Sequence, residues 1–155
     1  MSRPVITLTT DFGYADAYVG AMKGVILGIC PDSTLVDISH EIPPQAMRQA
    51  AYVLSAAAPY FPPKTVHLIV VDPGVGTSRR PIAVETQRPA YYVAPDNGVL
   101  SLAVAGDPVR QAVHLTDPRF QRPEVSATFH GRDIFAPAAA HLAAAQGPVF
   151  NECCR

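Results

Sequence analysis

A run of mainly β-branched apolar residues, Val66 to Val71 (VHLIVV), ends abruptly at Asp72-Pro73-Gly74. Both alternating faces of this run are apolar, which predicts a strand that is buried on both sides. The run from Pro4 to Thr9 has the same character and ends at the polar cluster Thr10-Asp11-Phe12-Gly13. Because strands buried on both faces need helices above and below, the sequence predicts an α/β fold, a three-layer sandwich with a largely parallel central sheet.

Helical patterns alternate with these strands. Apolar residues recur every three or four positions from about Ala15 to Ile29, and an alanine-rich stretch runs from Gln45 to Ala58. A proline follows each pattern within two residues, Pro31 after the first and Pro59 after the second, and ends the helix. The other predicted elements are strands at Thr34 to Ile38, Ile82 to Thr86, Tyr91 to Ala94 and Gln111 to Leu115, and helices at Val99 to Ala105 and from His130-Asp133 to about Ala145.

Length and composition indicate one compact domain. With 155 residues, 48% of them apolar, the chain is long enough to bury one hydrophobic core. We expect that domain to span residues 1–146, because Gly147-Pro148 breaks the last helix and leaves 147–155 as an irregular tail. The adjacent pair Cys153 and Cys154 has no matching second pair, so we expect neither a disulfide framework nor a zinc site.

Charge and hydropathy exclude several classes of partner. Twelve basic and thirteen acidic side chains give a formal charge of −1, and no run of Lys or Arg could follow nucleic acid or an anionic membrane. No stretch approaches the roughly 20 apolar residues of a spanning helix. Asp11 interrupts the apolar segment that a secretory signal would need, so we expect a cytoplasmic protein.

Three polar clusters follow predicted strands or open predicted helices. In an open α/β sheet, ligands bind beyond the carboxyl ends of the strands, so we expect these clusters to converge on one site. They are Thr10-Asp11-Phe12-Gly13 with nearby Asp16, the segment from Asp72 to Arg80, and Phe129-His130-Gly131-Arg132-Asp133.

Several polar residues in these clusters also have a structural interpretation. Asp11 could cap the first helix, and Asp72 could start a turn. His130 could be a buried, hydrogen-bonded histidine, and Arg132 with Asp133 reads as an ion pair at a helix entrance.

Other histidines fall outside the clusters. His40 and Glu41, in the segment ISHEIPP, could border the pocket, but the prediction is that they lie in a solvated turn. His67, His114 and His141 lie within predicted strands or a helix, and we expect them to be structural.

Four segments resemble one family when they are taken together. LTTDFGYADAYVGAMKG, VVDPGVGTSRR, YYVAPDNGVLS and ATFHGRDIFAPAAAHLA resemble the signature segments of the S-adenosylmethionine hydroxide adenosyltransferases, adenosine-forming hydrolases related to fluorinase and chlorinase. The segments occur in order over nearly the whole chain. The resemblance implies that water or hydroxide displaces methionine from C5′ of S-adenosyl-L-methionine, which releases adenosine and L-methionine.

The resemblance also implies catalytic roles. The aspartate, arginine and histidine that hold the attacking water in the family fall on Asp72, Arg79 and His130. Arg80 is adjacent, and spacing alone does not separate it from Arg79. The guanidinium would favour hydroxide character in the water, while the carboxylate and imidazole would accept or relay its proton.

Substrate contacts are implied in the same way. Asp11 matches the family's ribose-binding aspartate, and Asp16 matches a carboxylate that faces the methionine portion. Asn97 occupies the place of an asparagine in the family's core motif. Phe129 and Gly131 flank the position of the nucleophile.

The resemblance favours hydrolysis over halogenation. The halogenating relatives carry Tyr at the position of Asp72 and Ser at that of Gly131, and an anionic carboxylate would repel a halide. The electrophile is a sulfonium whose leaving group is a neutral thioether, so we expect neither a cofactor nor a metal.

Members of this family continue into a C-terminal β-barrel domain, which supplies much of the adenine pocket across a trimer interface. We expect that domain to be absent from this chain. The resemblance therefore implies a homotrimer only if a C-terminal domain is supplied, and low or no activity for the chain alone.

Two other functions fit the residues. One is a metal-assisted phosphoesterase that uses Asp11, Asp72, His130 and Asp133, although no Asp-x-Asp or His-x-His pair supports it. The other is a non-catalytic module that holds S-adenosylmethionine or adenosine without converting it.

Overall fold

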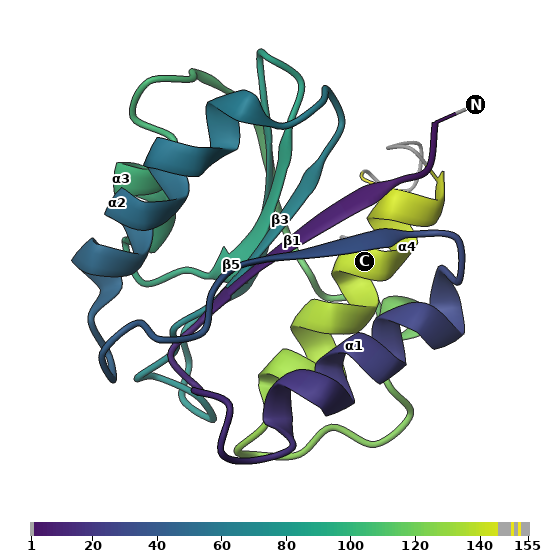
Figure 1. Cartoon of the computed structure of the whole chain (residues 1–155). Helices are drawn as coiled ribbons and strands as arrows, with labels where there is room; N and C mark the ends of the chain where they lie inside the picture. Colours follow the sequence, from purple (N-terminus) through teal and green to yellow (C-terminus); the bar gives the residue numbers. More distant parts are fainter. Residues whose placement is uncertain (1, 146–149, 151, 153–155) are drawn as a thin grey trace.

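The structure is a computed structural model, and it describes residues 2–145, 150 and 152. Within these residues, six strands form one sheet in the order β2-β1-β3-β5-β4-β6 (Figure 1). The strands are β1 (Val5–Thr10), β2 (Thr34–Ser39), β3 (Val66–Val70), β4 (Pro81–Thr86), β5 (Tyr91–Pro95) and β6 (Val109–His114).

The sheet is largely parallel, as predicted. The pairs β1 with β2, β1 with β3 and β3 with β5 are parallel, whereas β4 runs antiparallel to both β5 and β6. The reversal follows from chain length, because a short turn joins β4 to β5 and leaves no room for a crossover helix.

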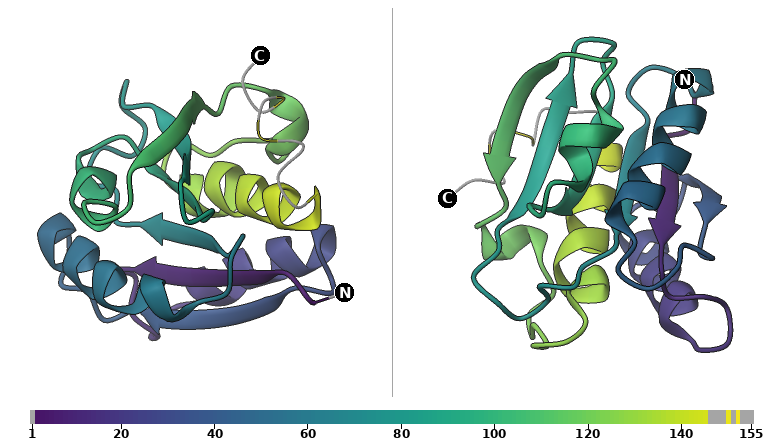
Figure 2. Two further views of the ribbon diagram at one scale, coloured as in Figure 1. Left: turned by 90° about the horizontal axis from the view of Figure 1, so that it is seen from above. Right: turned by 90° about the vertical axis from the view of Figure 1, so that its left-hand side faces the viewer.

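Helices cover both faces of the sheet, which confirms the predicted α/β fold (Figures 1 and 2). Helix α1 (Tyr18–Ile29) packs beside α4 (Ala136–Ala145), and α2 (Met47–Ala57) packs beside α3 (Val99–Ala103). Each face of the sheet carries its own hydrophobic core, and successive residues of β3 belong to different cores. Leu68 lies in the core under α1 and α4, and Ile69 lies in the core under α2 and α3. This is the two-sided burial that the apolar run predicted.

Helix ends account for most differences from the predicted elements. The first helix begins at Tyr18 rather than Ala15, and its N-cap is Ala17, so the interpretation of Asp11 as its cap is wrong. The second helix begins at Met47 because Gln45 adopts a φ of 64°, which a helix cannot contain. The last helix opens with a π-helical turn, η3 (Gly131–Phe135), that the sequence did not predict.

The remaining elements agree with the prediction to within one or two residues. The predicted tail, 147–155, lies almost wholly outside the described residues, as do Cys153 and Cys154. Phe150 is described, and it is buried against the ring of Tyr91 at 5.8 Å between centroids. Among the helices that the structure describes, none has the length and apolar character to cross a membrane.

Strand β3 carries a buried histidine. His67 is 1% exposed and lies between the rings of Phe61 and Tyr92. Its Nδ1 is 2.7 Å from Oγ1 of Thr7 on β1. Burial disfavours the charged imidazolium and lowers the pKa of His67 from 6.5 to about 4.

We expect this histidine to make the domain sensitive to acid. The unfolded chain binds a proton at His67 near pH 6.5, but the folded chain does so only near pH 4. Stability present above pH 6.5 is therefore lost as the pH falls toward 4, by about 3 kcal/mol in the free energy of unfolding. Urea unfolding at a series of pH values should show this loss reduced in His67→Asn and retained in His114→Asn, on an exposed position of β6. An undiminished loss in His67→Asn would contradict the assignment.

Candidate functional site

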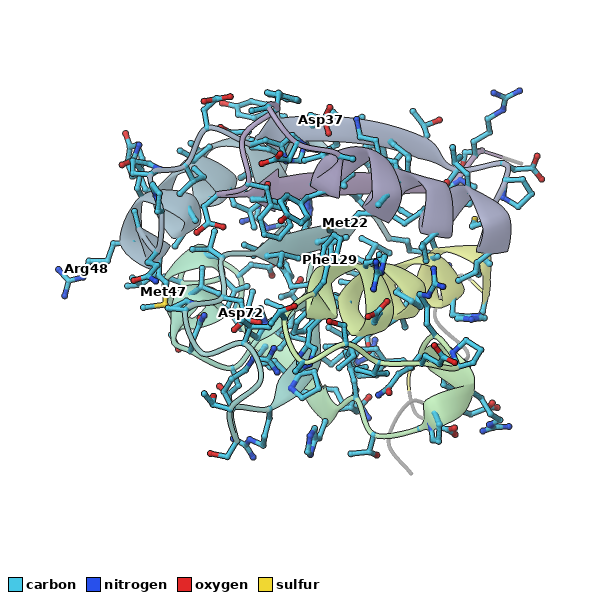
Figure 3. All side chains as sticks on the ribbon, turned by 90° about the horizontal axis from the view of Figure 1, so that it is seen from below. Met22, Asp37, Met47, Arg48, Asp72 and Phe129 are labelled. Carbon is cyan, nitrogen blue, oxygen red and sulfur yellow. The ribbon has the colours of Figure 1, made fainter. Side chains whose placement is uncertain are left out.

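Two of the polar clusters meet because their strands are neighbours. Thr10, the last residue of β1, pairs with Val70, the last residue of β3, so Asp11 and Asp72 emerge at the same edge of the sheet. The segment before the last helix brings Phe129 to the same end of the sheet. Figure 3 labels both Phe129 and Asp72 at this end.

These segments enclose a pocket of about 260 Å³. Its lining comes from residues in segments 11–12, 44–45, 70–75 and 128–131. A cavity of about 300 Å³ lies at the opposite end of the sheet, beside His67 and Tyr92. None of the three polar clusters borders that cavity, so the smaller pocket is the candidate site.

Asp72 and His130 line this pocket, and Arg79, which is not among the lining residues, bonds to both of them. The Arg79 guanidinium donates from Nε to Oδ1 of Asp72 at 2.9 Å and from Nη2 to Oδ2 at 2.5 Å. Nη2 also lies 2.7 Å from Nδ1 of His130. One planar guanidinium therefore holds both a carboxylate and an imidazole, which a lysine ammonium cannot do with the same geometry.

Burial makes these contacts electrostatically strong. The side chains of Arg79 and Asp72 are 9% and 6% exposed, and the guanidinium lies 5.2 Å from the centre of the Phe135 ring. Burial and the Arg79 charge lower the pKa of His130, outweighing the opposing effect of Asp72. Near neutral pH the imidazole is therefore uncharged, with Nδ1 accepting from Arg79 and the proton on Nε2.

Arg80 points elsewhere. Its guanidinium donates to Oδ2 of Asp96 from Nε at 3.0 Å and from Nη2 at 2.6 Å, and its side chain is 64% exposed. The structure therefore joins Arg79, and not Arg80, to Asp72 and His130.

The loop that follows Asp72 packs closely on the segment before His130. The backbone of Asp72 does start a turn, since its carbonyl accepts from the amide of Val75 at 3.2 Å. Gly76 has a φ of +78°, and a methyl group there would lie 2.6 Å from the carbonyl oxygen of Ala127. Only glycine satisfies both the conformation and the contact.

We expect Gly76→Ala to lower the free energy of unfolding by about 3 kcal/mol, through strain at positive φ and a backbone clash. Gly98 is a matched control, because its φ is +91° but a methyl group there would meet no heavy atom within 4 Å. Gly98→Ala should cost about 1 kcal/mol from strain alone. Equal losses for the two variants in urea unfolding would show that the Ala127 contact is unimportant.

The predicted substrate-binding residues divide into two groups. Asp11 lines the pocket, and its Oδ2 accepts from the backbone amide of Gln45 at 2.8 Å. Phe129 and Gly131 also line it. Asp16 is exposed and does not line this pocket.

Asn97 lies outside the pocket lining and bonds to the strand segment that precedes Asp72. Its Nδ2 donates to the carbonyl of Val71 at 2.8 Å, and its Oδ1 accepts from the amide of Val99 at 3.2 Å. It does not line the pocket, but it holds the residue that precedes Asp72.

Gly131 leaves little free space. A methyl group at this position would lie 3.3 Å from Sδ of Met22, 3.3 Å from Cγ1 of Val70 and 3.4 Å from Cε1 of Phe129. These contacts are tighter than ordinary van der Waals packing, so a larger side chain would displace the pocket wall.

The ion pair predicted for Arg132 and Asp133 is present, and it is larger than predicted. Asp133 is fully buried and accepts from Arg132 at 2.7 and 3.1 Å and from the amide of Ser126 at 2.8 Å, and Arg122 lies 3.4 Å away. Burial alone would raise the pKa of Asp133, but these hydrogen bonds and charges outweigh it and lower that pKa.

Sequence reasoning missed two features of the site. Pro44 and Gln45 line the pocket, although no motif marks them. His40, predicted in a solvated turn, is 1% exposed and hydrogen-bonded, so that prediction is wrong; neighbouring Glu41 is exposed as predicted.

A metal site receives no support from the side-chain arrangement. Among residues 2–145, 150 and 152, no three His, Cys, Asp or Glu side chains are grouped to hold a metal ion. The carboxylates of Asp72 and Asp133, two ligands of the phosphoesterase alternative, are held by arginines.

Residues 6–150 match the family described as the SAM hydroxide adenosyltransferase N-terminal domain. The (R)-S-adenosyl-L-methionine hydrolase of Thermus thermophilus is 50% identical over 149 residues, covering 91% of this chain and 57% of that protein. A fluorinase of Actinopolyspora mzabensis is 32% identical, with coverages of 92% and 55%. An uncharacterized conserved protein of Thermotoga maritima superposes with a TM-score of 0.92 at 43% identity, covering 97% of this chain and 58% of that chain. The chain spans about half the length of the curated relatives it matches.

Proposed function

Because the chain belongs to the SAM hydroxide adenosyltransferase family, whose N-terminal domain it matches over residues 6–150, we propose that it hydrolyses S-adenosyl-L-methionine to adenosine and L-methionine. The observation that carries the proposal is that Arg79 bonds to both Asp72 and His130, which line one pocket. The names of the hydrolase relatives support the same substrate.

The reaction is a displacement at C5′ of the substrate. A water oxygen forms a bond to C5′ while the bond from C5′ to sulfur breaks, and its electron pair returns to sulfur to give a neutral thioether. The water loses one proton. Since the leaving group needs neither a proton nor a metal, we propose that no cofactor takes part.

Asp72 is the proton acceptor in this proposal. Each of its carboxylate oxygens accepts one hydrogen bond from Arg79, which leaves further lone pairs for the water. Nδ1 of His130 is already occupied by Arg79, and the ring also bonds to the backbone of Ser126, so His130 would hold Arg79 in place beside the water rather than take the proton of the water. The Arg79 charge would favour the developing hydroxide.

The other pocket residues would bind the substrate. Asp11 would accept hydrogen bonds from the ribose hydroxyls, and Phe129 would form an apolar wall. Asp16 would face the methionine ammonium. Hydrolysis rather than halogenation follows from the negative charge of Asp72, which disfavours a halide in the same position.

The assembly and location of the protein are part of the proposal. We propose a homotrimer that forms when a C-terminal domain is supplied, in the cytoplasm and without nucleic-acid or membrane partners. Light scattering after size-exclusion chromatography, on the chain alone and joined to such a domain, measures the assembly directly. A monomer in both samples would reject the trimer.

The test of the activity is incubation with S-adenosyl-L-methionine in ¹⁸O-labelled water, followed by mass spectrometry. We expect adenosine labelled at its 5′ oxygen together with unlabelled methionine. The reaction is run with the chain itself and with a chimera that joins residues 1–145 to the C-terminal part of the Thermus thermophilus hydrolase. If neither forms adenosine while that hydrolase does, the proposal is wrong.

A binding module without turnover is the second candidate. It is favoured by one observation, that Asp11, Asp72 and Phe129 line a pocket that could hold a ligand, whereas Arg79 is not among its lining residues. Saturable heat of binding with S-adenosyl-L-methionine, with no adenosine formed by either protein, would favour this candidate.

A further inference from the structure

A series of hydrogen bonds runs from Lys23 on α1, through Asp37 on β2 and His40, to Thr10, which precedes the pocket-lining residues Asp11 and Phe12. Nζ of Lys23 lies 2.7 Å from Oδ2 of Asp37, whose Oδ1 lies 2.7 Å from Nε2 of His40. Nδ1 of His40 lies 2.7 Å from Oγ1 of Thr10, the last residue of β1. The His40 side chain is 0% exposed, whereas Asp37 lies on the β2 side of the molecule, away from Asp72 (Figure 3).

Asp37 determines the direction of these hydrogen bonds. Partial burial opposes its ionisation, but the bonds from Lys23 and His40 outweigh burial and lower the pKa of Asp37. The carboxylate therefore accepts from Nε2–H of His40. In the neutral ring Nδ1 is then an acceptor, and the hydroxyl of Thr10 donates to it.

His40 holds the backbone on both sides of Asp11. With its proton directed at His40, Oγ1 of Thr10 accepts from the amide of Phe12 at 3.3 Å. The carbonyl of His40 accepts from the amide of Gly13 at 2.8 Å, where φ is +67°. Asp11 and Phe12 both line the pocket, and neither touches His40 through a hydrogen bond of its own.

We propose that His40 is a positioning residue for substrate binding. Its side chain, bonded to Thr10, and its backbone carbonyl, bonded to Gly13, hold the loop that carries Asp11 and Phe12. The identity of the substrate in this inference rests on the proposed function. His40 touches no reacting atom, so its effect is on affinity rather than on chemistry.

The same strand supplies a matched control. Oγ1 of Thr7 and Nδ1 of His67 are also 2.7 Å apart and buried, and they join β1 to β3. Neither residue lines the candidate pocket. A hydroxyl removed at Thr7 therefore costs a similar buried bond without touching the loop at 11–13.

The experiment compares Thr10→Val with Thr7→Val in the full chain, using two readouts. Amide hydrogen exchange of Phe12 and Gly13, followed by NMR, reports the order of the loop. Calorimetry reports the dissociation constant for S-adenosyl-L-methionine. In Thr10→Val we expect exchange at both amides to be faster, and binding to be weaker, by about tenfold each. Thr7→Val should leave both within about twofold.

Two substitutions at His40 separate its two bonds. His40→Asn keeps an acceptor near Thr10 and should retain most of the loop protection, whereas His40→Gln, which reaches toward Asp37, should lose it. Thr10→Ser restores the hydroxyl and should restore both readouts. These outcomes distinguish positioning from general destabilisation, which would affect the variants in proportion to their stability.

The inference is overturned if Thr10→Val leaves exchange at Phe12 and Gly13 unchanged, or if Thr7→Val has the same effect on both readouts. It is also overturned if the loop loses protection but the dissociation constant does not change. If neither the chain nor its chimera with the Thermus thermophilus C-terminal part binds S-adenosyl-L-methionine, the proposed function fails, and the exchange data alone decide whether His40 orders the loop.

Discussion

Replacing Arg79 by lysine is expected to slow hydrolysis of S-adenosyl-L-methionine by about a thousandfold, the middle of the range for loss of a proton-transfer arrangement. Arg79 makes two bonds to Asp72 and one to His130 from a single rigid group. A lysine ammonium keeps the charge but cannot hold both partners at these positions. The rate is measured as adenosine formed, in the chain and in the chimera with the Thermus thermophilus C-terminal part.

The adjacent Arg80→Lys is the control. Arg80 bonds to Asp96 and is 64% exposed, so its substitution should leave the rate within about twofold. Circular dichroism of both variants checks that the fold is retained. If Arg80→Lys abolishes activity and Arg79→Lys does not, the assignment of the catalytic arginine is wrong.

Removing the Asp133 carboxylate is expected to cause the largest loss of stability. Asp133→Ala deletes the acceptor for Arg132 and for the amide of Ser126, all at a fully buried position. Removing one partner of a buried ion pair costs about 4 kcal/mol in the free energy of unfolding, and lowers the melting temperature by roughly 10 °C. Because its pKa is lowered, this stabilisation is present near neutral pH and is lost as the pH falls below the usual carboxyl range.

Asp96→Ala is the matched surface control. Asp96 also pairs with an arginine, but its side chain is 35% exposed, and we expect a loss below about 1 kcal/mol. Thermal and urea unfolding of both variants make the comparison. A loss at Asp133 no larger than that at Asp96 would mean that the buried carboxylate does not organise the segment before His130.

The sequence predicted best the helices and strands in which apolar residues recur at a regular spacing along the chain. Val66, Leu68 and Val70 make one face of this strand apolar, His67 and Ile69 form the other, and the structure buries all five residues. The prediction succeeded because a strand shows its two faces within a few residues. The π-helical turn at Gly131 was not predictable in this way, since it depends on contacts of Asp133 with Ser126 and Arg122.

The error at His40 has a different cause. A short polar segment followed by two prolines is typical of a surface turn. The ring is buried because the loop at 11–14 folds over it, placing Thr10 against Nδ1 and the ring of Tyr14 at 5.2 Å. The residues next to His40 in the sequence give no sign that it is buried, because the segment that buries it lies about thirty positions earlier in the chain.

The sequence by itself determined the alternation of strands and helices and the end of the sheet where the polar clusters gather, because periodic burial and strand direction are local properties. Only the tertiary structure decided which of two adjacent arginines meets Asp72 and His130. Arg79 and Arg80 have the same chemistry and neighbouring places in the chain. What separates them is contact with residues far along the sequence, since Arg79 reaches a histidine 51 positions away and Arg80 the half-buried carboxylate of Asp96, 16 positions away.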